Sequence, residues 1–557
     1  MDAKTILAFV LSFVVLLLWS FFFSQNEEQA TRKEGEPAEI GQERRVVEVP
    51  KAPAVSPPPQ TPTQEGRKPE AGLAVSEREV KVETPLYRAV FGNVGPTIKS
   101  FKLKKYRQST DPDSPPIEMV GLEQGMGDFL SVGFQSPKGL GGNPKAVYEV
   151  DEKAIRLGPE SSPRELVFRQ RTEDGLSVQK VFRFYPDRYR IDLEVGVANG
   201  SEQTAQGAFE ATLRAVPPEE KSSYYSYVGL VLLMNDELEE VKLKKASEEK
   251  TFTGDIDWVA YEDDYFISAV VPEGHSKGTF KGERLASGLL EGSYSAPSLS
   301  IGPSEQTSSA YTLYFGPRDL DILKDFGKKL DKAVDFGWTD IIAKPLLYVL
   351  HFFNQYIHNF GVSIILLTIL VKILFWPLTH KSYKSMKEMQ KLQPRLAKIR
   401  EKYKNNKEQM NKEMMALYKT YKVNPMGGCL PMIIQIPVFF ALFRILGNAI
   451  ELRHAPFMLW INDLSAPDRL FHFPFKIPFM APPSGIPVLT LLMGASMFIQ
   501  QKMTPTPGDP TQAKIMMFLP IIFTFLFINF PSGLVLYWLV NNILSIGQQY
   551  RIHKSPA

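Results

Sequence analysis

One stretch of the sequence, residues 360–378, constrains the fold more than any other. It is almost entirely apolar from Phe360 to Leu378 but contains Lys372. A helix of roughly 20 residues spans a bilayer, so this segment is long enough to place Lys372 inside the membrane. An ammonium near the bilayer centre costs about 2.5–3.5 kcal/mol on insertion scales. Either its stem snorkels to the nearer membrane surface, or it faces a wet cavity, and we favour the cavity.

The first 330 residues divide into three regions of different composition. Residues 6–23 are apolar and no small-residue cleavage site follows them, which predicts an uncleaved transmembrane anchor over residues 1–23. Residues 24–75 are rich in Pro, Glu, Gln and Lys, which predicts a disordered linker. Short alternating runs over residues 76–330, such as Tyr189–Asn199 after the turn at Pro186, predict antiparallel hairpins in a large β-sandwich.

The remaining sequence predicts helices. Residues 335–358 have the spacing of an amphipathic helix, kinked at Pro345, that lies on the membrane surface or at the edge of a domain. Residues 381–426 predict a basic helical hairpin that bends at Asn405 and Asn406. The positive-inside rule places this hairpin in the cytoplasm. Four further apolar segments complete a five-helix core over residues 360–550; they are residues 430–450, 486–499, 515–530 and 534–546.

The fold class is therefore a polytopic α-helical membrane protein with six transmembrane helices and a large β-sandwich domain outside the cytoplasm. Both termini are expected in the cytoplasm. Motifs for nucleotide hydrolysis, zinc proteolysis and serine hydrolysis are missing from the sequence, and Cys429 is the single cysteine, so we expect no enzyme, metal site or cofactor. None of the five later spans contains Asp or Glu, which argues against an ion-coupled transporter. A transporter, a lipid flippase and a non-catalytic assembly factor remain the alternatives.

Polar residues in the spans suggest a groove. Thr368 lies one helical turn before Lys372 and shares its face, and Gln435 lies in the next span with Phe439 one turn further on. Lys372 has no obvious anionic partner in the sequence, so we expect it to be hydrated in an open cavity. Gln435 either lines the same groove or bonds a neighbouring helix.

Three motifs identify a family: KVNPMGGCLP at Lys422–Pro431, QIP at Gln435–Pro437 and FPSGLVLY at Phe530–Tyr537. With them the sequence resembles the YidC/Oxa/Alb membrane protein insertases, in the long form of Gram-negative bacteria. The resemblance implies an inner-membrane insertase and chaperone that works without nucleotide hydrolysis, alone or with the Sec translocon. It also implies that the outer domain is periplasmic and is a β-supersandwich similar to sugar-binding domains.

The same resemblance implies a groove centred on one cation, with Lys372 in that role and Thr368, Gln435, Phe439, Tyr537 and Trp538 at the matching positions. Many relatives have arginine in place of Lys372 and tyrosine in place of Trp538. The implied partners are nascent inner-membrane proteins, the ribosome and membrane lipids, and no DNA. The hairpin cations expected to contact substrate or ribosome are Lys384, Lys391, Arg395, Lys398 and Arg400. Alternatively, these cations act only as a topology signal.

Overall fold

The computed structural model describes residues 77–122, 126–136, 146–172, 175–217, 227–274, 277–421, 423, 430–504 and 510–554. The predicted anchor at residues 1–23, the linker at 24–75 and most of the segment 422–429 lie outside the described residues. Contacts divide the chain into one unit of residues 1–74 with 506–514 and a second of residues 75–505 with 515–557. The second unit contains all the strands and nearly all of the described helices.

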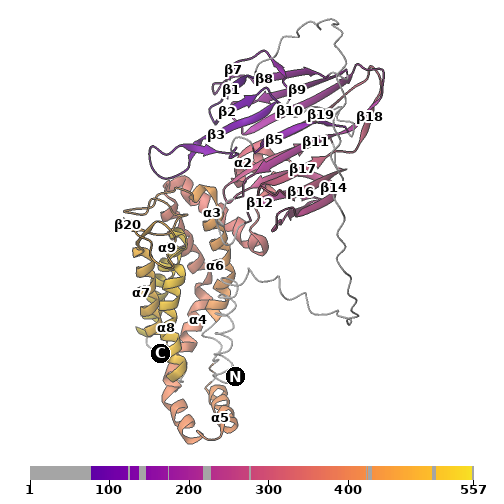
Figure 1. The fold of residues 1–557 in the computed structure, drawn as a ribbon. Coiled ribbons are helices and arrows are strands. Elements are labelled where there is room, and N and C mark those ends of the chain that lie inside the picture. Colours follow the sequence, from indigo (N-terminus) through magenta and orange to yellow (C-terminus); the bar gives the residue numbers. More distant parts are fainter. Residues whose placement is uncertain are drawn as a thin grey trace, which may run out of the picture. The chain divides into compact units, whose positions relative to one another are not determined.

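The first half of the described chain is mostly β-sheet, as the alternating pattern predicts (Figure 1). A five-stranded sheet has the order β4-β3-β2-β1-β7, from β1 (Glu79–Glu83), β2 (Tyr87–Gly92), β3 (Thr97–Arg107), β4 (Pro116–Glu118) and β7 (Ala154–Arg156). The second sheet has 14 strands. They are β5 (Leu130–Gln135), β6 (Glu149–Val150), β8 (Arg164–Arg171), β9 (Leu176–Phe184), β10 (Arg190–Asn199), β11 (Ala205–Ala215), β12 (Gly229–Met234), β13 (Glu237–Glu240), β14 (Glu249–Glu262), β15 (Phe266–Pro272), β16 (Lys277–Arg284), β17 (Leu290–Ser295), β18 (Leu299–Ile301) and β19 (Gln306–Pro317).

The hairpin predicted from the alternation of Tyr189–Asn199 is confirmed. β9 and β10 pair antiparallel, with Ile191 opposite Phe184 and Asn199 opposite Leu176. Every second side chain of β9 is buried, because successive residues of a strand point to opposite faces of the sheet. The strand pattern in the sequence therefore determines which residues enter the core.

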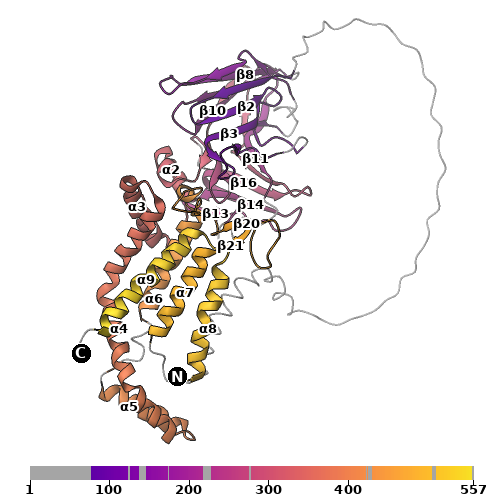
Figure 2. The same ribbon diagram turned by 90° about the vertical axis from the view of Figure 1, so that its left-hand side faces the viewer.

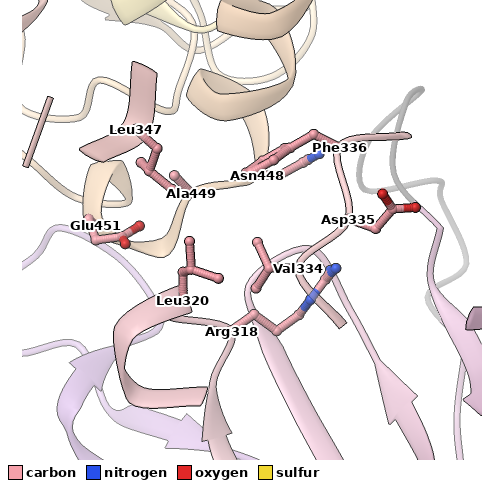
Figure 3. A pocket seen from close by; sticks show the side chains of 9 residues that line it. All are labelled: Arg318, Leu320, Val334, Asp335, Phe336, Leu347, Asn448, Ala449 and Glu451. Carbon is pink, nitrogen blue, oxygen red and sulfur yellow. The ribbon is translucent and has the colours of Figure 1, made fainter. Parts of the chain in front are cut away.

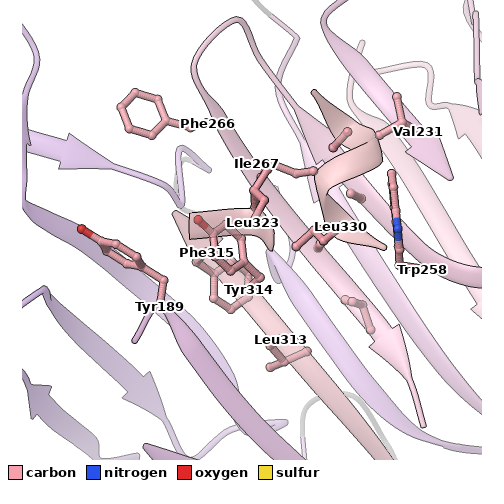
Figure 4. Packing of buried hydrophobic residues seen from close by; sticks show 14 of the residues in the cluster. Tyr189, Val231, Trp258, Phe266, Ile267, Leu313, Tyr314, Phe315, Leu323 and Leu330 are labelled. Carbon is pink, nitrogen blue, oxygen red and sulfur yellow. The ribbon is translucent and has the colours of Figure 1, made fainter. Parts of the chain in front are cut away.

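Aromatic side chains fill the space between the two sheets. Phe91 of β2 lies with its ring centroid 5.1 Å from that of Phe182, and Phe101 of β3 lies 5.1 Å from Phe315 of β19. The short helix α2 (Leu320–Phe326) and the 3-10 turn η1 (Leu330–Ala333) close one end of this core. Figure 4 shows the buried side chains there, with Leu330 beside Trp258.

The second half of the chain is helical (Figure 2). After the 3-10 turn η2 (Gly337–Thr339) come α3 (Asp340–Ile357), α4 (Phe360–Lys402), α5 (Lys407–Thr420) and α6 (Leu430–Asn448). The 3-10 turn η4 (Ile450–Leu452) and the strand pair β20 (Leu470–Phe473) and β21 (Ser484–Ile486) follow, and then α7 (Val488–Met503), α8 (Pro510–Phe527) and α9 (Ser532–Lys554). Among the described helices only α4 contains a window long and apolar enough to span a membrane by length and composition; α6 and α8 contain shorter apolar stretches at Gln435–Asn448 and Met516–Phe527.

The structure corrects one boundary. The sequence predicts a spanning helix that ends at Leu378 and a separate first arm of the hairpin, but α4 continues for 43 residues through both. Pro377 and Pro394 lie inside it and do not end it. A proline removes one backbone donor and kinks a helix, and packing can outweigh this cost. Here Leu392 and Leu396 are buried in the first arm, and Lys387 Nζ donates to the carbonyl of Ile552 in α9 at 3.1 Å.

Candidate functional site

Lys372 lies on α4, and its side chain is buried against α9. Only 7% of the residue is exposed, and its ammonium donates a hydrogen bond to Ser545 Oγ at 2.7 Å. No carboxylate pairs with it among the residues that the structure describes. The sequence predicted a hydrated cation in an open cavity. The structure gives the ammonium a hydroxyl partner on another helix, which meets part of the hydrogen-bonding requirement of a buried cation, and the hydration of Lys372 stays a prediction.

A second polar contact lies on the same face of α9. Gln435 Nε2 of α6 donates to Asn541 Oδ1 of α9 at 3.0 Å. Asn541 lies one helical turn before Ser545, and the Ser545 hydroxyl donates to the Asn541 carbonyl at 2.7 Å. Gln435 and Lys372 are therefore connected through a single turn of α9. We call Lys372, Gln435, Asn541 and Ser545 the polar layer.

Sequence reasoning missed the contribution of α9 to this layer. Its polar residues Asn541, Asn542, Ser545 and Gln548 recur at one-, three- and four-residue spacing in an otherwise apolar helix. Asn542 Nδ2 donates to Ser496 of α7 at 2.9 Å, and Gln548 Nε2 donates to Thr379 of α4 at 2.9 Å. This spacing was a signal available from the sequence, because polar side chains in a membrane helix face the bundle interior.

The aromatic groove residues form a separate layer. It lies about one helical turn away from the polar layer along α6 and α9. Phe439 of α6 and Trp538 of α9 meet edge to face with ring centroids 4.8 Å apart. From α8, the Phe527 ring lies 5.0 Å from Trp538 and the Phe523 ring lies 6.1 Å from it. These four side chains, which we call the aromatic layer, link α6, α8 and α9.

The other two predicted groove residues do not join either layer through a hydrogen bond that the structure describes. Thr368 is 1% exposed, and its hydroxyl donates to the Ile364 carbonyl of its own helix at 2.7 Å. Tyr537 is buried next to Trp538 in the chain. The structure therefore brings together Lys372 with Gln435 and Phe439 with Trp538, and leaves Thr368 and Tyr537 in the packing around them.

The end of the bundle away from α5 is closed by a buried acid and a buried base. Asp468 accepts hydrogen bonds from Trp460 Nε1, at 2.6 Å, and from the backbone of Leu489 at the start of α7. Arg469 donates to the Ile528 carbonyl, just after α8, at 2.8 Å. Each charge lies at the helix end whose dipole it complements. The sequence did not point to this pair, because its partners are distant in the chain.

The predicted hairpin cations are mostly in solvent. Lys384, Lys391, Arg395 and Lys398 are exposed on α4, whereas Arg400 is half-buried. Lys391 pairs with Glu388 at 3.1 Å, and the Arg395 guanidinium lies 4.9 Å from the centre of the Tyr421 ring. Exposed cations on the surface of a helix can contact an anionic surface.

A cavity lies where α2, α3 and the end of α6 meet (Figure 3). Its lining residues are Arg318, Leu320, Val334, Asp335, Phe336, Leu347, Asn448, Ala449 and Glu451. Beside it His351 Nε2 lies 3.1 Å from Glu451 Oε1. Burial lowers the pKa of His351, but the charges of Glu451, Asp321 and Asp319 outweigh it and leave that pKa raised. No residue of the polar or aromatic layer lines this cavity, so it is distinct from the predicted groove.

Known proteins resemble this chain over its whole length. Residues 79–349 match the family model described as "YidC periplasmic domain", and residues 352–557 match "60Kd inner membrane protein". The chain is 44% identical to the membrane protein insertase YidC of Syntrophus aciditrophicus, over 100% of both chains. It is 41% identical to that of Pelobacter propionicus, over 100% of this chain and 99% of the relative. A crystal structure of an active YidC insertase is 18% identical, with a TM-score of 0.36, over 85% of this chain and 93% of the other.

Proposed function

Because this chain belongs to the YidC family of membrane protein insertases, we propose that its substrates enter the membrane through a polar groove whose cation is Lys372. The protein is an inner-membrane insertase with a mostly β-sheet periplasmic domain. The observation that supports this route is the polar layer, in which Lys372 and Gln435 meet one turn of α9. No nucleotide is consumed in the proposed route.

The proposed cycle begins with Lys372 bonded to Ser545. An acidic or polar flank of the nascent segment replaces the Ser545 hydroxyl as the partner of the ammonium. A hydrogen bond to a charged group contributes about 1.5–3 kcal/mol, which lowers the cost of bringing a carboxylate to this depth. The apolar part of the segment then partitions into lipid, and burial at about 25 cal/mol per Å² supplies the driving force.

The two layers have different tasks in this proposal. The polar layer receives the hydrophilic flank. The aromatic layer lies further from the basic hairpin and closes the groove on the periplasmic side, with Asp468 and Arg469 sealing the end of the bundle. Closure at that end prevents the flank from passing through an open aqueous channel. The flank crosses only after the apolar helix has moved into lipid.

We also propose six transmembrane helices: the anchor at residues 1–23, the first part of α4, and α6, α7, α8 and α9. This count places both termini and the basic hairpin in the cytoplasm, and the cations of the hairpin support it. α3 then lies at the membrane surface, where Ile341 and Tyr356 are 87% and 70% exposed, while Leu347 and Leu350 are buried on its opposite face.

The basic hairpin is the proposed receiving surface. Lys384 and Lys398 are exposed and offer positive charge to ribosomal RNA phosphates or to an acidic nascent chain. The insertase would act on nascent inner-membrane proteins directly or beside the Sec translocon, with membrane lipids as the acceptor phase.

The test is insertion of a short single-span protein with an acidic flank into liposomes that contain the purified insertase. Lys372→Ala should slow insertion about ten- to hundred-fold, because it removes one charge-assisted bond of about 1.5–3 kcal/mol. Lys372→Arg keeps the charge and should retain activity. Insertion by Lys372→Ala at the rate of the unmodified protein would show that the groove mechanism is wrong.

A further inference from the structure

The segment between Arg469 and α7 exposes several aromatic side chains. Residues 470–487, which we call the aromatic loop, include β20 and β21. Its residues Phe471, Phe475 and Phe479 are 69%, 60% and 89% exposed. Exposed apolar side chains that are scattered singly are normal, but a cluster on one short segment marks a contact surface.

The backbone of the aromatic loop is held in an unusual conformation that presents these rings. Phe471 and Phe479 have left-handed φ angles of 56° and 64°. This region costs about 1–2 kcal/mol for a residue with a Cβ, and it is rare for bulky side chains. Strain of this size persists where the surrounding structure enforces it, and it is concentrated at functional sites.

A side chain at the end of α8 fixes the conformation. Asn529 Nδ2 donates to the Phe479 carbonyl at 2.9 Å, and Asn529 Oδ1 accepts from the Ala481 backbone N–H at 2.8 Å. The rings of Phe473 and Phe475 stack 5.3 Å apart at an interplanar angle of 7°. These two hydrogen bonds fasten the loop to the bundle through its backbone, so they do not use the exposed aromatic side chains.

The aromatic loop is attached at the end of a helix with an exposed apolar face. Asn529 follows α8, whose Phe518, Ile522 and Phe525 are 62%, 49% and 68% exposed. β21 ends two residues before α7 begins at Val488 (Figure 2). In a membrane protein these exposed faces of α8 are covered by lipid, so the loop is attached at the end of a lipid-facing helix.

The charges of the aromatic loop also favour contact with lipid. Lys476 and His472 are its only ionisable side chains, and residues 470–487 include no Asp or Glu. Lys476 is exposed beside Phe475. A cation next to aromatic rings suits the boundary between lipid phosphates and acyl chains, where aromatic residues are enriched in membrane proteins.

Contacts with the β-sheet domain identify the side of the membrane. The Tyr265 hydroxyl donates to the Gly447 carbonyl at 3.3 Å, near the end of α6, and Arg453 donates to the Arg107 carbonyl at 2.8 Å. The segment between α6 and α7 therefore lies at the end of the bundle that carries the periplasmic domain. We propose that the aromatic loop inserts Phe471, Phe475 and Phe479 into the periplasmic leaflet and places Lys476 at the lipid phosphates.

The single cysteine of the chain provides a direct test. In a Cys429→Ser background, Phe475→Cys and Phe479→Cys are labelled separately with an environment-sensitive fluorophore. The full-length protein is reconstituted in vesicles of phosphatidylethanolamine and phosphatidylglycerol. Both side chains are exposed, so their replacement leaves the core packing intact. The matched control is Glu202→Cys, at an exposed acidic position in a turn of the β-sheet domain.

We expect phospholipids with a nitroxide near the headgroup to quench both loop labels and to leave the Glu202→Cys label unaffected. Aqueous iodide should quench the Glu202→Cys label several-fold more strongly than the loop labels. Iodide quenching of the loop labels equal to that of the control would overturn the proposal, because the loop would then face water. Protection from both quenchers would also overturn it, in favour of coverage by protein, and dilution of the protein in lipid would identify a second copy as that cover.

Discussion

Ser545→Ala is the substitution that tests the polar layer most sharply, because it removes the hydroxyl that binds Lys372. The Lys372 ammonium donates to Ser545 Oγ at 2.7 Å, and both side chains are buried. A hydrogen bond to a charged group is worth about 1.5–3 kcal/mol, and an ammonium left without a partner keeps its full desolvation cost. We therefore expect Ser545→Ala to lower the free energy of unfolding by about 2–4.5 kcal/mol, of which about 1.5–3 kcal/mol belongs to the bond with Lys372 and about 0.5–1.5 kcal/mol to the neutral bond that the same hydroxyl donates to the Asn541 carbonyl.

A double-mutant cycle separates this bond from the other contact of Ser545, whose hydroxyl also donates to the Asn541 carbonyl at 2.7 Å. Lys372→Met replaces the cation with an apolar side chain of similar length and should leave stability unchanged or raise it, because a buried charge is removed. In the Lys372→Met background, Ser545→Ala should cost only the neutral bond, about 0.5–1.5 kcal/mol. The cycle is measured by denaturant unfolding of the purified protein in detergent micelles.

Ser545→Thr is the matched control, since it keeps the hydroxyl and should retain the stability of the unmodified protein. A coupling energy between Lys372 and Ser545 within about 0.5 kcal/mol of zero would show that the two side chains do not interact, because that is the additivity expected of independent sites. The same variants should also differ in how tightly they bind an acidic substrate flank in liposomes. Ser545→Ala frees the ammonium for a substrate carboxylate, so it should bind an acidic flank more tightly than the unmodified protein.

Three further substitutions test other parts of the structure. Gly361→Ala should destabilise the bundle by about 1–3 kcal/mol in the same unfolding assay, because a Cβ there would lie 2.0 Å from the Phe457 ring; an unchanged midpoint would contradict the packing. Burial raises the pKa of Glu262 from 4.5 to about 7, so its contribution to stability is present below pH 4.5 and is lost as pH rises to 7. Glu262→Gln should therefore stabilise the protein at pH 8 by up to about 3 kcal/mol and have little effect on stability at acid pH. Equal effects at the two pH values would show that ionisation of Glu262 does not destabilise the protein. The raised pKa of His351 means that its pairing with Glu451 is complete below its usual value of 6.5 and is lost as pH rises through the raised pKa; His351→Gln should remove that component of the pH dependence of thermal unfolding.

The elements of the helical half follow closely from the apolar pattern. The predicted segment 430–450 is α6, which covers Leu430–Asn448, and the predicted segment 486–499 is α7, which covers Val488–Met503. The length of α4 could not be predicted, because prolines and a change of composition at Leu378 are the usual marks of a helix end. Packing of the first hairpin arm against α9 overrode those local signals.

The candidate site was predicted in part. Lys372 and Gln435 were identified because each is a polar residue in an apolar span. Phe439 was identified because it lies one helical turn after Gln435. Periodicity gives the face of a helix on which a residue lies, but not the helix that the face meets. Ser545 and Asn541 could be found as polar residues of the last helix, yet their pairing with Lys372 and Gln435 depends on tertiary contacts.

The buried pair of Asp468 and Arg469 shows even more clearly that the sequence pattern does not give the tertiary partners of a residue. Arg469 binds the carbonyl of Ile528 and the side chain of Asn529, which lie 59 and 60 positions later in the chain. In the sequence the pair resembles any two adjacent charges of a surface loop. Only the fold places it between the ends of α7 and α8, where each charge complements a helix dipole.

We propose that the Lys372 charge lowers the barrier for a hydrophilic flank. The most direct measurement is the ratio of liposome insertion rates for two substrates that differ only in having an aspartate or an asparagine in the flank. With the unmodified protein and with Lys372→Arg this ratio should favour aspartate, and with Lys372→Met it should fall about ten- to hundred-fold. An identical ratio for the unmodified protein and Lys372→Met would show that the Lys372 charge does not assist insertion of the flank.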